Sequence, residues 1–431
     1  LVPDWEWPYK LPENWCWTRH NSIMDIVGGA QPEKAFFIRE SKEGYVQLYQ
    51  TRDYGENPVP VYIPQKYATK TTDEGDILLA RYGGSLGKVF RAHKGAYNVA
   101  LAKVIILYPE VVDDEFLYLY YYSHFYQDFC IKAGYGRSAQ AGFNKSDLNE
   151  LLFPLPPFIE QQRIVDRIES LFAKLDEAKE KAQAVVDSFE TRKAAILHKA
   201  FTGELTAKWR KEHGVGMESW EVRTLDSVCS SIFDGDHMPP PKAESGIPFL
   251  VISNVNTGHL TFENTRFVPQ EYYDTLSDTR KPQLGDVLYT LVGSFGIPVV
   301  VNSKRPFCFQ RHMALLRPID VSPQFLWYIL QTPEMYDKAS SIATGTAQLT
   351  VPIKGLRAMT IPRPNIAEQV EIVRILDGFF AREQSAKEAA EAVLDQINLM
   401  KKSILARAFR GELGTNDPSE ESAVELLKQI I

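Results

Sequence analysis

The sequence is poor in cysteine and has no long apolar run. Its four cysteines, Cys16, Cys130, Cys229 and Cys308, lie far apart and form no C-x-x-C pair, which argues against a zinc ribbon or a redox dithiol. We expect thiols in a reducing cytosol. No apolar run approaches the ~18 residues of a membrane span, and the first residues, LVPDWEWPYK, lack the basic-then-apolar order of a secretory signal. The sequence therefore predicts a cytoplasmic location.

An excess of positive charge is also missing. The net charge is -7, from 48 basic and 55 acidic residues. Neutralisation of phosphates by Lys and Arg supplies most non-specific affinity for nucleic acids. Any DNA binding must therefore depend on local basic patches.

Motifs for catalysis are absent as well. The segment 81–88 resembles a phosphate loop, but Tyr82 stands where a glycine is needed and Val89 where Ser or Thr is needed. The run Asp234-Gly235-Asp236-His237 lacks the other ligands of an EF-hand and any H-E-x-x-H partner, so we interpret it as a turn. No Asp-Pro-Pro-Tyr type motif of an adenine methyltransferase and no G-x-S-x-G elbow occurs. We expect no catalytic residue, no metal site and no cofactor on this chain.

What the chain does contain is a long internal repeat. Residues 154–205 match residues 362–413 without a gap at a constant spacing of 208 residues, and about 23 of the 52 positions are identical. Upstream the match is looser and links Trp15 with Trp220. The motif G-D-[IV]-L occurs at 75–78 and again at 285–288. The order is therefore variable unit, helix, variable unit, helix.

Both repeated segments have the heptad pattern of a coiled coil, because apolar positions alternate steps of four and three. The first set is Ile164, Ile168, Leu171, Leu175, Ala178, Ala182, Val185, Phe189, Arg192 and Ile196. The second set is Ile372, Leu376, Phe379, Glu383, Ala386, Ala390, Val393, Ile397, Met400 and Ile404. The two polar exceptions, Arg192 and Glu383, lie near the ends of the seam or fix its register. The alternative is two amphipathic helices that pack separately on their own domains.

Chain geometry predicts that the helices are antiparallel. A helix from about Phe158 to Ala200 is about 64 Å long, whereas the connector 206–216 reaches only ~38 Å. The second unit then begins near the far end of the first helix and also stands at the start of the second. We expect one unit at each end of a rod, related by a pseudo-two-fold axis.

The expected domain boundaries follow from the repeat: globular domains 1–153 and 217–361, helices 154–205 and 362–413, connector 206–216 and tail 414–431. Both globular units are predicted to be mixed α/β domains. Strand-like runs at 46–49, 103–107 and 298–301 alternate with helical patches at 115–126 and 323–331.

Each variable unit has an acid-free window, between Asp76 and Glu110 and between Asp286 and Asp320, and a polar cluster before its helix. Their Arg, Lys, Gln, Asn and hydroxyl side chains suit contacts with base edges and phosphates. The candidate DNA-contacting residues of the first unit are Gln50, Thr51, Arg52, Arg81, Ser85, Lys88, Arg91, Lys94, Arg137, Gln140, Asn144 and Lys145. Those of the second unit are Ser253, Asn254, Asn256, Ser294, Lys304, Arg305, Arg311, His312, Thr346, Gln348 and Lys354. The alternative for any one residue is a solvated loop, and for 50–53 and 253–256 it is an Asx-type turn.

The helix motifs carry a family resemblance. Each helix is introduced by P-x-P followed by E-Q, at 154–161 and 362–369, and closed by A-F-x-G-E-L, at 200–205 and 408–413. In this combination the chain resembles the specificity subunit of type I restriction-modification systems over nearly its whole length.

The resemblance implies that each unit is a target-recognition domain for one half of a split, non-palindromic DNA site. The helices would set the spacer and dock two modification subunits, which hold S-adenosylmethionine and methylate adenine. Two restriction subunits dependent on ATP and Mg would join them.

The main alternative is a two-headed coiled-coil scaffold that binds proteins and no DNA, which the net acidity favours. A second alternative is an enzyme whose catalytic part lies elsewhere on a longer chain, since the sequence begins with Leu1 instead of Met.

Overall fold

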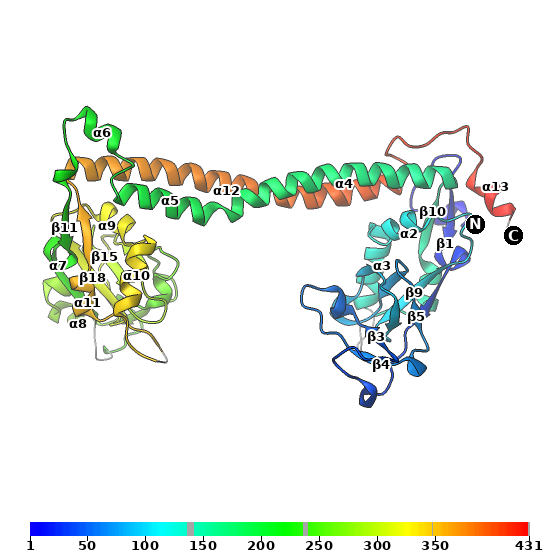
Figure 1. The fold of residues 1–431 in the computed structure, drawn as a ribbon, viewed down its shortest axis with the longest axis horizontal. Helices are drawn as coiled ribbons and strands as arrows, with labels where there is room; N and C mark the ends of the chain where they lie inside the picture. Colours follow the sequence, from blue (N-terminus) through cyan, green and yellow to red (C-terminus); the bar gives the residue numbers. More distant parts are fainter. Residues whose placement is uncertain (136–141, 236–239, 347, 430–431) are drawn as a thin grey trace. The chain divides into compact units, whose positions relative to one another are not determined.

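The structure is a computed structural model that describes residues 1–135, 142–235, 240–346 and 348–429 (Figure 1). The chain forms two compact units. Unit 1 contains residues 1–182 and 392–431, and unit 2 contains residues 183–391. Each unit therefore holds one globular domain together with part of each repeated helix.

Unit 1 is built on a four-stranded antiparallel sheet in the order β2-β9-β6-β7, with β2 at Met24–Gly28, β9 at Leu101–Ile106, β6 at Ile77–Ala80 and β7 at Val89–Arg91. All four residues of β6 are buried, as expected for a central strand covered on both faces. A second sheet has the order β4-β3-β8-β5, with strands at Tyr62–Pro64, Tyr45–Tyr49, Gly95–Tyr97 and Thr71–Thr72. The pair β1 (Cys16–Arg19) and β10 (Leu152–Leu155), and the helices α1 (His20–Ile23), α2 (Asp114–Tyr120) and α3 (His124–Tyr135), complete the domain.

Unit 2 repeats this topology. Its main sheet has the order β12-β18-β15-β16, with strands at Cys229–Asp234, Met313–Pro318, Val287–Thr290 and Pro298–Val300. The second sheet, β14-β13-β17, has strands at Arg266–Val268, Ile247–Leu250 and Cys308–Phe309. The pair β11 (Glu221–Thr224) and β19 (Thr360–Arg363) corresponds to β1 and β10. The helices are α6 (Ala207–Glu212), α7 (Leu225–Val228), α8 (Gln270–Thr275), α9 (Pro323–Ile329), α10 (Pro333–Ile342) and α11 (Ile353–Ala358). The prediction of two mixed α/β domains is confirmed.

Corresponding helices of the two units begin with the same kind of cap. The Asp113 carboxylate accepts a hydrogen bond from the Phe116 amide (2.9 Å) at the start of α2. The Ser322 hydroxyl accepts one from the Phe325 amide (3.1 Å) at the start of α9. Each cap satisfies an amide that the first helical turn cannot pair.

The first long helix is broken, in contrast to the single helix expected from Phe158 to Ala200. It consists of α4 (Phe158–Asp187) and α5 (Phe189–Phe201), with Ser188 between them. The Ser188 hydroxyl donates to the Ala184 carbonyl, a bond that bends helices because it competes with the backbone ladder. The Arg192 guanidinium donates to Ser188 and to the Val185 carbonyl (3.2 Å) at the same break. The second long helix, α12 (Ile366–Ala408), is continuous.

The predicted seam agrees with burial along the first helix, where none of its ten positions is exposed. It is partly wrong for α12, where Ala386, Val393 and Met400 are exposed. The less exposed positions are one residue later, at Lys387, Leu394 and Lys401. An undistorted α-helix drifts relative to a strict seven-residue repeat, and this drift moves the buried face of the helix to the positions one residue later.

Within each unit the two helical segments run in opposite directions. In unit 1, Lys401 Nζ lies 2.5 Å from the Asp176 carboxylate, and Asn416, beyond the end of α12, donates to Glu160 near the start of α4. In unit 2, the Arg192 guanidinium lies 2.7 Å from the Glu383 carboxylate. The two polar exceptions in the seam thus pair with each other.

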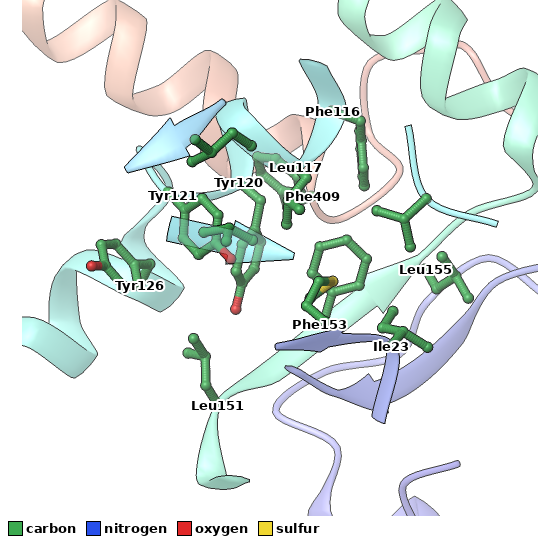
Figure 2. Close-up of a cluster of buried hydrophobic side chains, with 14 of the residues drawn as sticks. Ile23, Phe116, Leu117, Tyr120, Tyr121, Tyr126, Leu151, Phe153, Leu155 and Phe409 are labelled. Carbon is green, nitrogen blue, oxygen red and sulfur yellow. The ribbon is translucent and has the colours of Figure 1, made fainter. Parts of the chain in front are cut away.

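The end of each long helix enters a domain core. Ala408 and Phe409 are fully buried in unit 1, where the Phe409 ring lies 5.1 Å from Phe116 and 5.7 Å from Tyr120 (Figure 2). In unit 2, Phe201 contacts Phe325 at 5.3 Å. The repeated A-F pair is therefore a core residue pair of the domain at which the other helix begins.

All four cysteines are buried, and none forms a disulfide in the part of the chain that the structure describes. Burial raises the pKa of Cys16, Cys130 and Cys229 to about 12. Among the described residues, no helix combines the length and the apolar character needed to cross a bilayer.

Candidate nucleic-acid interface

The E-Q motif fastens each long helix to its domain. In unit 1 the buried Glu160 accepts hydrogen bonds from the Trp15 indole (2.7 Å) and from Asn416 (2.8 Å). Gln161 accepts from the Asp113 amide (2.8 Å) and donates to the Val111 carbonyl (2.7 Å). Burial raises the pKa of Glu160, and the bonds from Trp15 and Asn416 counteract part of that rise.

Unit 2 has the same anchor with one addition. Glu368 accepts from the Trp220 indole (3.0 Å) and from the Thr206 hydroxyl (2.6 Å), and it also pairs with the nearly buried Arg210. Gln369 accepts from the Ser322 amide (2.9 Å). The sequence shows the motif and the matching tryptophans but not their contact. The recurrence of a Trp and a Glu at matching positions of the repeat was the signal from which this contact could have been predicted.

In the first domain, the polar loop that follows β6 contacts the polar segment that precedes the long helix. The Phe143 amide donates to the Arg81 carbonyl (3.2 Å), and Tyr82 forms an antiparallel bridge with Gly142. The Arg81 guanidinium lies over the Tyr82 ring, 4.8 Å from its centroid, and the Tyr82 hydroxyl donates to Asn144 (3.2 Å). The loop after β6 and the segment before the long helix therefore form one surface.

The second domain joins the corresponding segments in the same way. Val292 bridges Thr350, and the Val351 amide donates to the Leu291 carbonyl (2.9 Å). A cavity of about 480 Å³ at this junction is lined by Arg311, His312 and Gln348 among others. Burial and the neighbouring Arg311 lower the pKa of His312, which favours the neutral form of its ring. Aliphatic side chains thus stand where the first domain has Arg81 and Tyr82.

Most of the sequence-predicted site residues are accessible on these surfaces. The exposed ones are Arg52, Lys88, Lys94, Asn144, Lys145, Ser253, Asn256, Ser294, Lys304, Arg305, Arg311, Thr346, Gln348 and Lys354. Gln50, Thr51, Arg81, Ser85 and His312 are half-buried. Arg137 and Gln140 lie outside the described residues.

Arg91 and Asn254 instead have structural partners within their own domains, and the exposed Lys145 pairs with Asp25 at 2.6 Å. Arg91 pairs with Asp114 and Glu115 and lies over the Tyr118 ring at 4.3 Å. Asn254 is buried, accepting from the Val251 amide and donating to the Glu263 carbonyl, both at 3.0 Å. We leave Arg91 and Asn254 out of the proposed interface.

Short 3-10 turns occupy 51–54 and 252–254, so the turn interpretation applies to these stretches. In the first of them Asp53 accepts from the Gln50 amide at 2.8 Å. Gln50 and Thr51 therefore help to form a turn of their own domain.

The acid-free windows carry less unpaired positive charge than their sequences indicate. Lys103 pairs with Asp76 at 2.5 Å, and Arg317 pairs with Asp286 at 2.9 Å. Both acids are the Asp of the G-D-[IV]-L motif, and both bases stand on the adjacent strand, β9 or β18. This motif thus secures the sheet and removes one positive charge from each window.

The phosphate-loop-like segment is described in full, and the acidic run only in part. Residues 83–85 form a 3-10 turn. Asp236 and His237 lie outside the described residues, and the remaining described chain has no group of three potential metal ligands among His, Cys, Asp and Glu.

Comparison with known proteins agrees with this architecture. The model of the "Type I restriction modification DNA specificity domain" family matches residues 12–186 and 217–394. The EcoKI specificity subunit of Escherichia coli K12 is 26% identical over 98% of this chain and 96% of its own length. The MjaVIII specificity subunit of Methanocaldococcus jannaschii is 25% identical over 94% of each chain.

Two solved structures have the same fold. One, described as "Structural basis underlying complex assembly and conformational transition of the type I R-M system", has a TM-score of 0.71 and 22% identity over 94% of this chain and 100% of that chain. The HsdS subunit from Thermoanaerobacter tengcongensis has a TM-score of 0.63 and 21% identity over 94% of this chain and 99% of its own.

The chain therefore belongs to the type I restriction-modification DNA specificity family. Its function is that of a non-catalytic DNA-specificity subunit.

Proposed function

We propose that each globular domain reads one half of a bipartite, non-palindromic DNA site. The observation that supports this proposal is that the two domains have the same framework but different surfaces. The same strand order and the same bridge present Arg81 and Tyr82 in the first domain and Leu291 and Val292 in the second. Different side chains at the same place select different bases.

Within each half-site, we assign base reading to the junction of the two polar segments. In the first domain this junction presents Arg81 and Asn144, and in the second it presents Arg311 and Gln348. Arg suits guanine, and Asn or Gln suits adenine, because their hydrogen-bonding groups match the major-groove edges of those bases. The exposed lysines Lys94, Lys304 and Lys354 suit phosphates.

We further propose that the paired helices form an antiparallel coiled coil that sets the spacer. The 43 residues of α12 span about 64 Å. Two readers on one face of a duplex must be about one helical turn, 34–36 Å, or a multiple of it apart. The corresponding anchors at Glu160 and Glu368 support a pseudo-two-fold arrangement of the domains with the boundaries given above.

We propose that the helices also dock two modification subunits, which two restriction subunits join. The support is a set of exposed apolar side chains on α12: Val393 (44%), Leu399 (56%) and Met400 (44%). A helix that shields only one face leaves such residues for a partner. S-adenosylmethionine, ATP and Mg would be bound by these partners, and this chain would bind no cofactor.

Duplex binding at several salt concentrations, with the modification subunits present, tests DNA recognition against a protein scaffold. A DNA reader releases counterions, so its affinity should fall steeply with salt. A scaffold without DNA binding should show no salt-dependent retention of the duplex.

Lengthening both helices tests the spacer. Insertion of one heptad into α4 and one at the corresponding place in α12 should increase the distance between the half-sites without changing their bases. Mapping of methylated adenines would contradict the spacer role if the half-site bases changed while the spacing did not.

A further inference from the structure

Unit 1 contains a groove where the globular domain meets the helix pair. It has a volume of about 830 Å³ and is lined by the loop after β6, by α2 and α3, and by α4 and α12. We call it the helix-corner groove. All of its lining residues belong to unit 1.

The floor of the helix-corner groove is apolar and its rim is basic. Leu86, Leu119, Phe172 and Leu405 supply hydrophobic surface from four different elements. Lys88 and Lys402 supply exposed positive charge, Lys401 is paired with Asp176, and none of the described residues that line the groove is acidic. This is notable in a chain whose net charge is -7. The groove therefore suits a ligand that combines carboxylates with an apolar side chain.

The corresponding place in unit 2 is different. Through the repeat, Lys402 corresponds to Ala194 and Phe172 to Phe380. There the Tyr328 ring stacks on Phe380 at 5.5 Å, and its hydroxyl donates to Asp377 at 2.6 Å. Ala194 thus stands where unit 1 has Lys402, and Tyr328 stands where it has Leu119.

We propose that the helix-corner groove binds an acidic segment of the modification subunit that inserts an apolar side chain. The inference rests on the proposed function and assigns a further contact to one unit only. A DNA backbone fits less well, because phosphates gain nothing from the aliphatic and aromatic floor. The groove also continues the proposed docking face, since Leu399 and Met400 precede Lys401 and Lys402 on α12.

The test uses charge variants of the full chain. Asn398→Asp with Lys402→Glu reverses the charge on the exposed rim of the groove, and Lys193→Glu changes the position of unit 2 that corresponds to Lys401. We expect the double variant to bind purified modification subunit about tenfold more weakly, because like charges at an interface oppose binding. The control should stay within about twofold. Circular dichroism melting of each variant checks folding.

An environment-sensitive dye supplies a second readout. A cysteine at Asn398 or at the corresponding Glu190 can be labelled selectively, because the native cysteines are buried. Added modification subunit should shift dye emission to the blue for Asn398→Cys and leave that for Glu190→Cys unchanged.

Equal binding of the wild type and the double variant would overturn the groove proposal alone. Loss of DNA affinity with unchanged modification-subunit binding would instead mark the groove as a phosphate site and also overturn it. A wild-type chain that failed to bind the modification subunit would overturn the docking part of the proposed function as well.

Discussion

The two globular domains share their framework and differ in their recognition surface. Both have the main sheet in the same strand order, the same Trp–Glu contact at the helix start and the same bridge after the central strand. At that bridge, however, the first domain has the Arg81 guanidinium stacked on Tyr82, whereas the second domain has a cavity beside Leu291. Features that hold the helices are repeated, and features that face solvent have diverged.

This contrast separates two kinds of constraint. A helix anchor must fit a buried, fully hydrogen-bonded position, so few alternatives keep it satisfied. A surface loop can exchange side chains at small cost in stability. Reading unlike half-sites from one framework depends on that freedom.

The largest expected effect concerns the helix anchors. Glu368→Ala leaves the guanidinium of the nearly buried Arg210 without its carboxylate, which should destabilise unit 2 by about 3–5 kcal/mol. Glu160→Ala leaves the donors of Trp15 and Asn416, which are neutral, and should destabilise unit 1 by about 1–3 kcal/mol. Urea unfolding followed by tryptophan fluorescence measures both losses.

Glu169→Ala is the matched control, since this residue is exposed on the same helix as Glu160. Its change should stay within about 0.5 kcal/mol. Equal losses for Glu160→Ala and Glu368→Ala would contradict the distinction between the two anchors.

The recognition surfaces should fail independently. Arg81→Ala should weaken binding through the first half-site by about 1–3 kcal/mol, and Arg311→Ala should do so through the second. Competition with duplexes in which one half-site is randomised separates the two contributions. A variant that lost both halves equally would argue against one domain per half-site.

The interhelical ion pairs of the two units sharpen the comparison further. Arg192 serves Glu383, Ser188 and the Val185 carbonyl at the helix break, so Arg192→Met should cost about 1–3 kcal/mol. The more exposed Asp176–Lys401 pair should contribute about 0.2–1 kcal/mol, as measured by Asp176→Ala. The double variant Arg192→Glu with Glu383→Arg should recover part of the stability that Arg192→Met loses, as measured by thermal melting. No recovery would exclude the direct ion pair as the source of that stability.

The smallest expected effect is on pH dependence. Because burial raises the pKa of Glu160, its contribution to stability is present at acidic pH and is lost as the pH rises through that raised pKa. Glu160→Gln carries no charge, so its stability relative to the wild type should increase from pH 4 to pH 7. Urea midpoints at both pH values measure this difference, and a constant difference would contradict the raised pKa.

The sequence predicted the repeat, the two α/β domains and the long helices, because these depend on periodicity over many residues. It did not predict the break at Ser188, which depends on one hydroxyl and on Arg192. It also placed Ala386, Val393 and Met400 in the seam of α12, where small deviations from a strict heptad accumulate.

Candidate site residues were harder to predict than the fold. A sequence shows that Arg91 is basic but not that Asp114 and Glu115 lie beside it. Nor does it show that Asn254 closes a turn. Long-range contacts decide which polar residues remain available for DNA.

Mapping of methylated adenines in DNA from cells that express this chain with its modification subunit tests the central claim most directly. We predict one motif made of two different half-sites separated by a fixed number of unspecified bases. A continuous motif, a palindromic motif or a variable gap would contradict the account.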